Sequence, residues 1–154
     1  MAHMHFEDTE LNREYSGPSH VIRKSDVAVF GHLCLDEHPM HMDEAFARTT
    51  QFGGLIAHGL YGLSIMAGLK GRLALYGHNA IASLGWNNVK FPRPIYPDCT
   101  VFIRAWATSM RLCRNPSRGI VTYKAVLFGE REDELVSGDH ILMVRTRSPA
   151  QTTL

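Results

Sequence analysis

Residues 56–76 read IAHGLYGLSIMAGLKGRLALY. Leucine, isoleucine and methionine recur around the whole circumference of a helix formed by this stretch, rather than along one stripe. A surface helix needs a polar face, so a helix that is apolar nearly all round is expected to be buried. We therefore predict a buried central helix that extends to Tyr76 and is ended by Gly77.

Four glycines interrupt this helix: Gly59, Gly62, Gly68 and Gly71. Each weakens helix formation by about 1 kcal/mol relative to alanine. A structural reason to tolerate them is close approach of the surrounding backbone, as when a sheet wraps around the helix.

The chain after the helix has the composition of strands. Runs rich in valine, isoleucine, threonine and aromatic residues are separated by prolines, glycines and acidic turns. They are long enough to favour a strongly curved sheet. We predict four strands joined as an antiparallel meander, over residues 81–91, 100–111, 119–129 and 134–146. The exposed edges of such a sheet invite pairing with a second copy, so we expect a dimer.

Shorter elements precede the central helix. Residues 18–24 suit a small first strand, and Ser25–Asp26 look like the start of a helix that runs to about residue 34. After a polar loop, Asp43 can cap a short helix over residues 44–49. The sum is an α+β fold, in which a curved antiparallel sheet wraps around a long central helix.

Length and charge narrow the class of protein. A chain of 154 residues without repeats or linkers predicts a single domain over 1–154, with its core at about 18–146. Sixteen Lys+Arg against fifteen Asp+Glu leave a net charge of +1, so no general field recruits nucleic acid or an anionic membrane. No stretch reaches the roughly 20 apolar residues of a membrane span. Three cysteines without paired spacing favour a reducing, cytoplasmic location.

One polar segment carries the candidate chemistry. Asp36 and His41 lie in a loop that Pro39 stiffens, and a carboxylate and an imidazole held near each other can polarise one water. Ala57–Gly59 opens the central helix, where backbone N–H groups lack partners and lie in a positive field. A water-activating pair and an oxyanion site are the two parts of an addition across an α,β-unsaturated carbonyl.

These motifs resemble the MaoC-like, R-specific enoyl-CoA hydratase family of the hotdog fold. The family signature is Gly-Asp-x-Asn-Pro-x-His-x-Asp, followed by a short helix, a Gly-containing turn and Ala-His-Gly. Here DEHPMHMD at 36–43 aligns with it without gaps, and FGGLIAHG at 52–59 supplies the continuation. Residues 89–96 and 118–121 resemble the family's later strand exit and hairpin. The resemblance covers roughly residues 18–146.

The resemblance implies a function and a set of site residues. Asp36 and His41 would activate water for syn addition to a 2-enoyl thioester, or run the reverse dehydration, and the Gly59 amide would hold the thioester oxygen. Coenzyme A would enter as part of the substrate, with no metal or redox cofactor, and the unit would be a homodimer or a dimer of dimers. The expected substrate-binding residues are His38, Pro39, His58, Ser64 and Arg93.

Two positions depart from the family pattern. Leu35 replaces the usual glycine before the aspartate, so that this residue is not expected to take a left-handed conformation comfortably. His38 replaces the usual asparagine. A neutral imidazole can substitute for the amide as a hydrogen-bonding group, but its charge varies near pH 6–7.

Simpler interpretations of single residues stay open. His58 fits a structural residue packed beside the site better than a second base, and the Ser64 hydroxyl can simply bond a backbone carbonyl one turn back. A metal site built from Asp36, His38, His41 and Asp43 is the weaker interpretation, because Pro39 breaks the helical register and no cysteine joins the group.

Two other functions remain for the same fold. A hotdog thioesterase would use the same helix N-terminus to polarise the thioester, but no Asp or Glu lies between Gln51 and Pro97 to supply its carboxylate. A non-catalytic acyl-binding subunit is the second alternative. The Asp36 and His41 pair argues against it, because such a subunit needs neither residue.

Overall fold

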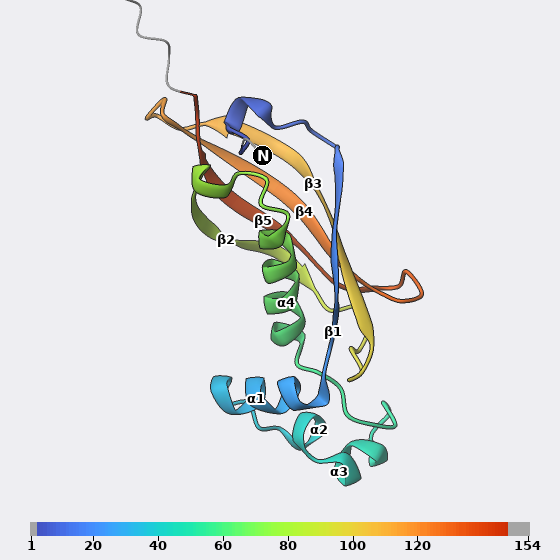
Figure 1. The fold of residues 1–154 in the computed structure, drawn as a ribbon. Helices are drawn as coiled ribbons and strands as arrows, with labels where there is room; N and C mark the ends of the chain where they lie inside the picture. The colour runs from blue at the N-terminus through green and yellow to red at the C-terminus, as the bar shows by residue number, and fades with distance from the viewer. Residues whose placement is uncertain (1–2, 148–154) are drawn as a thin grey trace, which may run out of the picture.

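A computed structural model describes residues 3–147, which form one five-stranded antiparallel sheet curved around a long helix (Figure 1). The predicted α+β arrangement is confirmed, and the ends of the predicted domain, 1–2 and 148–154, lie outside the described residues. No helix in the described range is long and apolar enough to cross a membrane. In chain order the elements are η1 Phe6–Asp8, β1 Glu14–Val21, α1 Lys24–Cys34, α2 Pro39–Met42, α3 Glu44–Thr49, α4 Gly59–Arg72, η2 Gly77–Asn79, β2 Ala80–Lys90, β3 Thr100–Leu112, β4 Arg118–Gly129 and β5 Glu134–Arg145.

The strands follow the order β1-β3-β4-β5-β2. The four long strands begin and end within one residue of the predicted bounds, and β3, β4 and β5 form the expected meander. The meander was wrong for β2, which pairs with β5 at the far edge. Residues 91–99, which join β2 to β3, contain three prolines and are too long for a tight hairpin. The connection therefore carries the chain across to the other side of the sheet.

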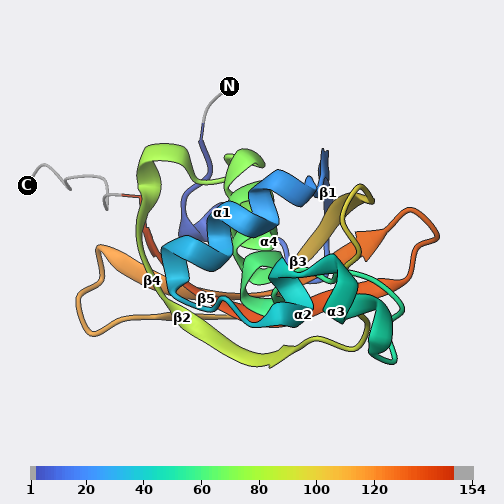
Figure 2. The same cartoon turned by 90° about the horizontal axis from the view of Figure 1, so that it is seen from below.

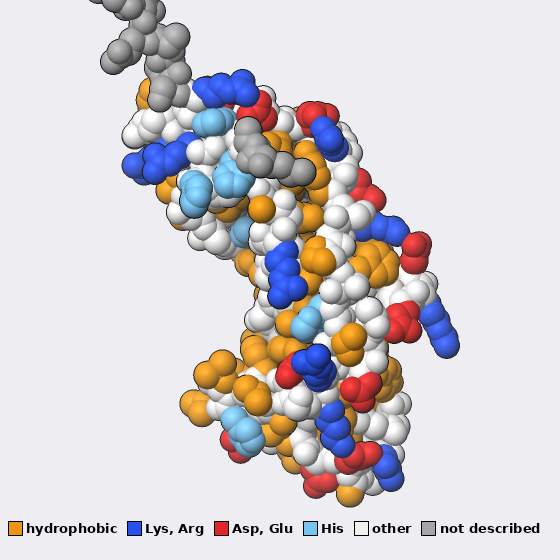
Figure 3. Space-filling model, in the orientation of Figure 1, with side chains coloured by type: hydrophobic (Ala, Val, Ile, Leu, Met, Phe, Trp, Pro, Cys, Tyr) orange, Lys and Arg blue, Asp and Glu red, His pale blue; other side chains and the backbone are white. Residues whose placement is uncertain are grey.

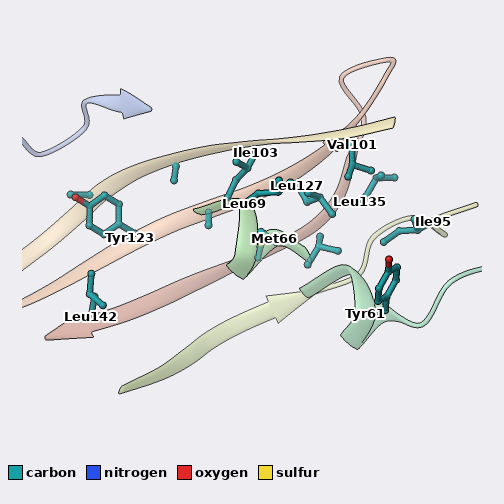
Figure 4. Packing of buried hydrophobic residues seen from close by; sticks show 14 of the residues in the cluster. Tyr61, Met66, Leu69, Ile95, Val101, Ile103, Tyr123, Leu127, Leu135 and Leu142 are labelled. Atoms are coloured by element: carbon teal, nitrogen blue, oxygen red, sulfur yellow. The ribbon is translucent and has the colours of Figure 1, made fainter. Parts of the chain in front are cut away.

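Helix α4 packs one face into the hollow of the sheet. Tyr61, Met66 and Leu69 lie on this face and are buried in the hydrophobic core (Figure 4). On the opposite face Leu60 is 60% exposed, and Ser64 is also exposed. The expectation of all-round burial is therefore wrong for the single chain, because the sheet covers one side of the helix only.

The predicted end of the central helix was also wrong. The helix stops at Arg72, and Ala74 takes a left-handed conformation with φ 49°. Gly77, with φ 47°, instead opens the 3-10 turn η2 that leads into β2. Chain reversal thus begins several residues before the glycine, at a non-glycine position.

The glycines of α4 divide into two pairs. A Cβ at Gly62 would overlap Ile95 Cδ1 and lie 2.9 Å from Val136 Cγ2, and one at Gly59 would lie 2.9 Å from the Phe91 ring. Close approach is confirmed there, although side chains rather than backbone make it. For Gly68 and Gly71 the explanation was wrong, because nothing lies within 4 Å of their Cβ positions.

The segment before α4 forms a separate helical layer at the lower end of the molecule. Helices α1, α2 and α3 gather across the N-terminal end of α4 (Figure 2). The predicted helix at 44–49 is confirmed, with the Asp43 carboxylate accepting from the Ala45 and Phe46 N–H groups at 2.9 and 3.1 Å. The first strand was predicted at 18–24, but β1 ends at Val21 because the turn into α1 already begins there.

The two kinds of glycine predict opposite effects of alanine. Gly68→Ala should stabilise the fold by up to about 1 kcal/mol, because alanine is the better helix former and its Cβ meets open space. Gly62→Ala should destabilise it by about 1–3 kcal/mol, because its Cβ overlaps Ile95 and Val136. Urea unfolding of both variants measures the difference. A loss of stability in Gly68→Ala would contradict the open-space assignment and place another chain against that face.

Candidate active site

Asp36 is positioned by the end of α1. The backbone turns at Leu35, whose φ of 63° and ψ of 21° are left-handed, and the Leu35 and Asp36 N–H groups both donate to the Gly31 carbonyl. The expectation that a leucine would avoid this conformation was wrong. The helix cap and the bonds to Gly31 hold the turn, although a left-handed non-glycine residue costs roughly 1–2 kcal/mol.

His41 lies on the short helix α2, and not in a loop as the sequence suggested. His38 is the N-cap of α2, and its Nδ1 accepts from the Met40 N–H at 3.2 Å. An imidazole thus performs the capping role that an asparagine amide would perform. Pro39 occupies the first turn, where its missing N–H costs nothing. Together they fix the direction in which the helix presents His41.

The His41 ring is oriented by a single hydrogen bond. Its Nδ1 lies 2.7 Å from the Ile56 carbonyl oxygen, which can only accept, so Nδ1 carries the proton and Nε2 keeps a free lone pair when the ring is neutral. Burial lowers the pKa of His41 below 6.5, and the neighbouring His58 and His38 act in the same direction, against the opposing effects of the Ile56 carbonyl and Asp36. The neutral, proton-accepting form is therefore favoured at pH 7.

His58 links this segment to the start of α4. Its Nε2 donates to the Asp36 carbonyl oxygen at 2.8 Å, and its ring stacks on His41 with centroids 3.9 Å apart. The side chain is only 3% exposed, and its Nδ1 has no hydrogen-bond partner in the part of the chain that the structure describes. These contacts give His58 the geometry of a positioning residue beside the site.

The Asp36 carboxylate and the imidazoles of His41 and His58 lie close together. One ligand atom each from Asp36, His41 and His58 lies within 4.8 Å of the others, and the Asp36 carboxylate is 56% exposed. A single water can bridge a carboxylate oxygen and an imidazole nitrogen at this separation. The arrangement can hold and polarise one water molecule.

The structure does not bring together the four residues of the alternative metal site. Asp43 caps α3 and His38 caps α2, so both are engaged away from the cluster. Asp36, His41 and His58 have the spacing of metal ligands, and His58 Nε2 is engaged by the Asp36 carbonyl.

A pocket of about 300 Å³ joins His41 to the N-terminus of α4. Gly59 is the first residue of the helix, and the N-cap His58 makes no side-chain capping bond there. Free N–H groups at this end therefore lie in the positive field of the helix. Phe91 explains why glycine is needed, because a Cβ at position 59 would press on its ring. The pocket can place a carbonyl oxygen near the Gly59 amide.

Of the remaining predicted substrate-binding residues, Arg93 lies at the pocket and Ser64 lies away from it. Arg93 lines the same pocket and donates to the Glu134 carbonyl at 3.3 Å. Ser64 lies outside the pocket on the exposed face of α4, and its hydroxyl donates to the Leu60 carbonyl at 2.9 Å. Phe52 and Phe91 line the pocket but were not singled out, although both lie within or beside the quoted motifs. The sequence Phe-Pro-Arg-Pro at 91–94, directly after β2, is the feature that could have indicated Phe91 as a pocket residue.

Comparison with known proteins identifies the family. A family model described as a MaoC like domain matches residues 7–127. This chain belongs to that family. The (R)-specific enoyl-CoA hydratase of Aeromonas caviae is 30% identical to this MaoC-like chain over 118 residues, which are 77% of this chain and 83% of that protein.

Solved structures agree on the fold of this MaoC-like chain. An Archaeoglobus protein described as a monoamine oxidase regulatory protein superposes with a TM-score of 0.87 at 27% identity, covering 96% of this chain and 97% of that one. A Mycobacterium tuberculosis protein described as a double hotdog fold gives a TM-score of 0.80 at 14% identity, covering 99% of this chain and 47% of that one. The predicted hotdog fold is confirmed.

The buried environment of His41 predicts an unusual titration. The ring should titrate below pH 6.5, and its Nδ1–H tautomer should dominate at pH 7. Lowering the pH through 6.5 should reduce the free energy of unfolding, because the unfolded chain binds a proton that the folded ring resists. Ring NMR spectra across this range measure the midpoint and the tautomer. A midpoint at or above that of a free histidine peptide, about 6.5, would contradict the assignment.

Proposed function

We propose that this protein adds water to a 2-enoyl-CoA thioester, or removes it from the corresponding 3-hydroxyacyl-CoA. The observation that carries the proposal is the position of the Asp36 carboxylate and the His41 imidazole within 4.8 Å of each other, next to the uncapped N-terminus of α4. Membership of the MaoC-like family and the similarity to an (R)-specific enoyl-CoA hydratase support it.

The reaction divides between the Asp36 and His41 pair and the Gly59 amide; His41 and Gly59 line the pocket, and Asp36 lies beside His41 outside its lining. Asp36 and His41 hold one water, and the free Nε2 of His41 takes its proton as the oxygen bonds to C3 of the enoyl group. Negative charge then develops on the thioester oxygen, where the Gly59 N–H and the helix field stabilise it. Return of the proton to C2 on the same face completes syn addition. The reverse sequence is the dehydration.

The remaining predicted residues take supporting roles in this proposal. His38 and Pro39 hold α2, and His58 holds the Asp36 backbone, so all three orient the reacting pair. The guanidinium of Arg93 at the mouth of the pocket supplies a cation for the phosphates of coenzyme A. Ser64 lines a separate hollow with Arg72, so its role in binding substrate requires an acyl chain that reaches the exposed face of α4.

A homodimer in the cytoplasm belongs to the same proposal. The open edge strand β2 carries exposed Ile81 and Leu84, and the outer face of α4 carries exposed Leu60. Pairing of two β2 edges would extend the sheet and cover apolar surface. All three cysteines are free, as expected in a reducing compartment.

Substitution of either member of the pair tests the chemistry. Asp36→Asn and His41→Ala should each lower the rate of crotonyl-CoA hydration at least about 100-fold while leaving thermal unfolding nearly unchanged. Asp43→Asn is the matched control, because it makes the same chemical change and asparagine still caps α3. Full activity in both site variants would overturn the catalytic assignment.

The product separates the hotdog alternatives in the same assay. Loss of the enoyl absorbance without free thiol means hydration, and release of free thiol means thioester cleavage. Binding of crotonyl-CoA with neither change would mark a non-catalytic acyl-binding subunit. Helix α4, from which a hotdog thioesterase would supply its carboxylate, contains no Asp or Glu, which favours hydration over cleavage.

The molar mass of the protein in solution tests the proposed homodimer. Sedimentation equilibrium should give at least twice the 17.3 kDa of the chain, and Leu84→Lys in β2 should shift the protein toward the monomer, because it places charge on the exposed apolar edge. A monomeric wild-type protein would exclude the dimer.

A further inference from the structure

A second pocket lies at the opposite end of α4. It has a volume of about 230 Å³, is partly open to solvent, and is lined by the last turns of α4, the segment leading to β2, and β5. Three titratable side chains line it: Lys70, Tyr76 and His140. Since α4 rises about 1.5 Å per residue, Lys70 lies roughly 16 Å along the helix from Gly59. The pocket is therefore distinct from the candidate active site of the same chain.

Lys70 brings an uncompensated charge into this pocket. The side chain is 8% exposed, and its ammonium group lies over the Tyr123 ring, 4.3 Å from the centroid. No acidic residue lines the pocket, and Lys70 makes no ion pair or hydrogen bond within residues 3–147. Burial lowers the pKa of Lys70 to about 8, so the amine is still largely charged at pH 7. A buried cation of this kind is stabilised by an anion.

His140 also lines the pocket, and one of its ring nitrogens has no partner among the described residues. It stacks on Trp86 at 4.5 Å, and its Nε2 lies 2.8 Å from the Ser83 hydroxyl. Its Nδ1 is buried and has no partner among the described residues. Burial, together with the charge of Lys70, lowers the pKa of His140 to about 4, so the ring is neutral near pH 7. In the tautomer in which the Ser83 hydroxyl donates to Nε2, Nδ1 carries a proton that it can donate.

The other titratable groups around Lys70 do not supply the missing anion. The Tyr76 hydroxyl is already bonded to Thr9 and Tyr123, at 2.6 and 2.9 Å. Burial raises the pKa values of Tyr76 and Tyr123, so both are neutral. Histidine side chains gather over the upper end of the surface (Figure 3). The His3 ring lies next to Gly77, one of the residues that line the pocket. The surroundings of Lys70 are thus neutral or basic.

We propose that this pocket binds a carboxylate, which pairs with the Lys70 ammonium and accepts a hydrogen bond from His140 Nδ1. A single cation matches a single carboxylate charge, and the apolar remainder of the lining suits a short alkyl chain. Binding would satisfy the buried charge and the buried unpaired nitrogen together.

Sodium propionate is the first probe, with propionamide and sodium chloride at equal ionic strength as controls. Propionate should raise the melting temperature and shift the Trp86 indole NMR signal, because Trp86 stacks on His140. Propionamide and chloride should do neither. Binding should weaken as the pH is raised through about 8, where Lys70 loses its charge.

Three variants assign the binding to these residues. Lys70→Met should weaken propionate binding about 10- to 100-fold, the equivalent of one lost charge-assisted hydrogen bond. Lys90→Met, at an exposed lysine of β2, should leave it unchanged. His140→Phe keeps the ring on Trp86 but removes the donor, and should weaken binding while Lys70 stays in place. This variant carries the test if Lys70→Met fails to fold.

The source of the carboxylate is distinguished with succinyl-CoA and butyryl-CoA. A Lys70-dependent preference for succinyl-CoA, without binding of propionate, would place the carboxylate on an acyl-CoA whose thioester lies outside the Gly59 site, because a succinyl chain is too short to reach from Gly59 to Lys70. Binding of propionate would place it on a free acid. Either result supports the proposal. Equal effects of propionate and propionamide with no preference for succinyl-CoA, or Lys70→Met that binds like wild type, would overturn it. Crotonyl-CoA hydration is not part of this readout, so the two proposals fail separately.

Discussion

Two imidazole-to-carbonyl hydrogen bonds hold the site together. His58 donates to the Asp36 carbonyl at 2.8 Å, and His41 donates to the Ile56 carbonyl at 2.7 Å, so the bonds run in both directions between the α1–α3 layer and the entry to α4. Asp36 itself is exposed, and α2 is only four residues long. Together with the stacking of the His41 and His58 rings and the Ile56 N–H bond to the Met40 carbonyl, these bonds keep the carboxylate and the imidazole together. The same bond at His41 also selects the tautomer that leaves Nε2 free.

Much of the fold could be predicted because its signals are local. The long strands were placed to within one residue by runs of β-formers bounded by turn residues, and α3 was placed by its Asp43 cap. The partner of β2 could not be predicted in this way, because a proline-rich connection decides where the strand lands. The prediction that α4 is buried on all sides failed for a similar reason, since the sheet of one chain covers only one face of the helix.

The site was predictable as a set of motifs but not as a set of contacts. The spacing of Asp36, His41 and Gly59 pointed to residues that the fold does bring to one end of α4. The stacking of His58 on His41 and the packing of Phe91 on Gly59 depend on distant segments, so no local pattern announces them. Ser64 is the opposite case, because the sequence suggested it for substrate binding but it lies outside the pocket. Its position in the helix does not indicate which face of α4 a substrate or a second chain would cover.

The strand order has a consequence for how the chain folds. The β3–β4 and β4–β5 pairings join neighbouring segments, whereas Glu14 pairs with Trp106 and Ala80 with Val144, so both outer strands close long loops. Pairings between distant segments lose more chain entropy before they gain contacts. The central three strands are thus the natural nucleus, and β1 and β2 add late. Until β1 and β2 dock, the outer edges of β3 and β5 lack partners, so a chain that has not finished folding exposes two strand edges at which aggregation would begin.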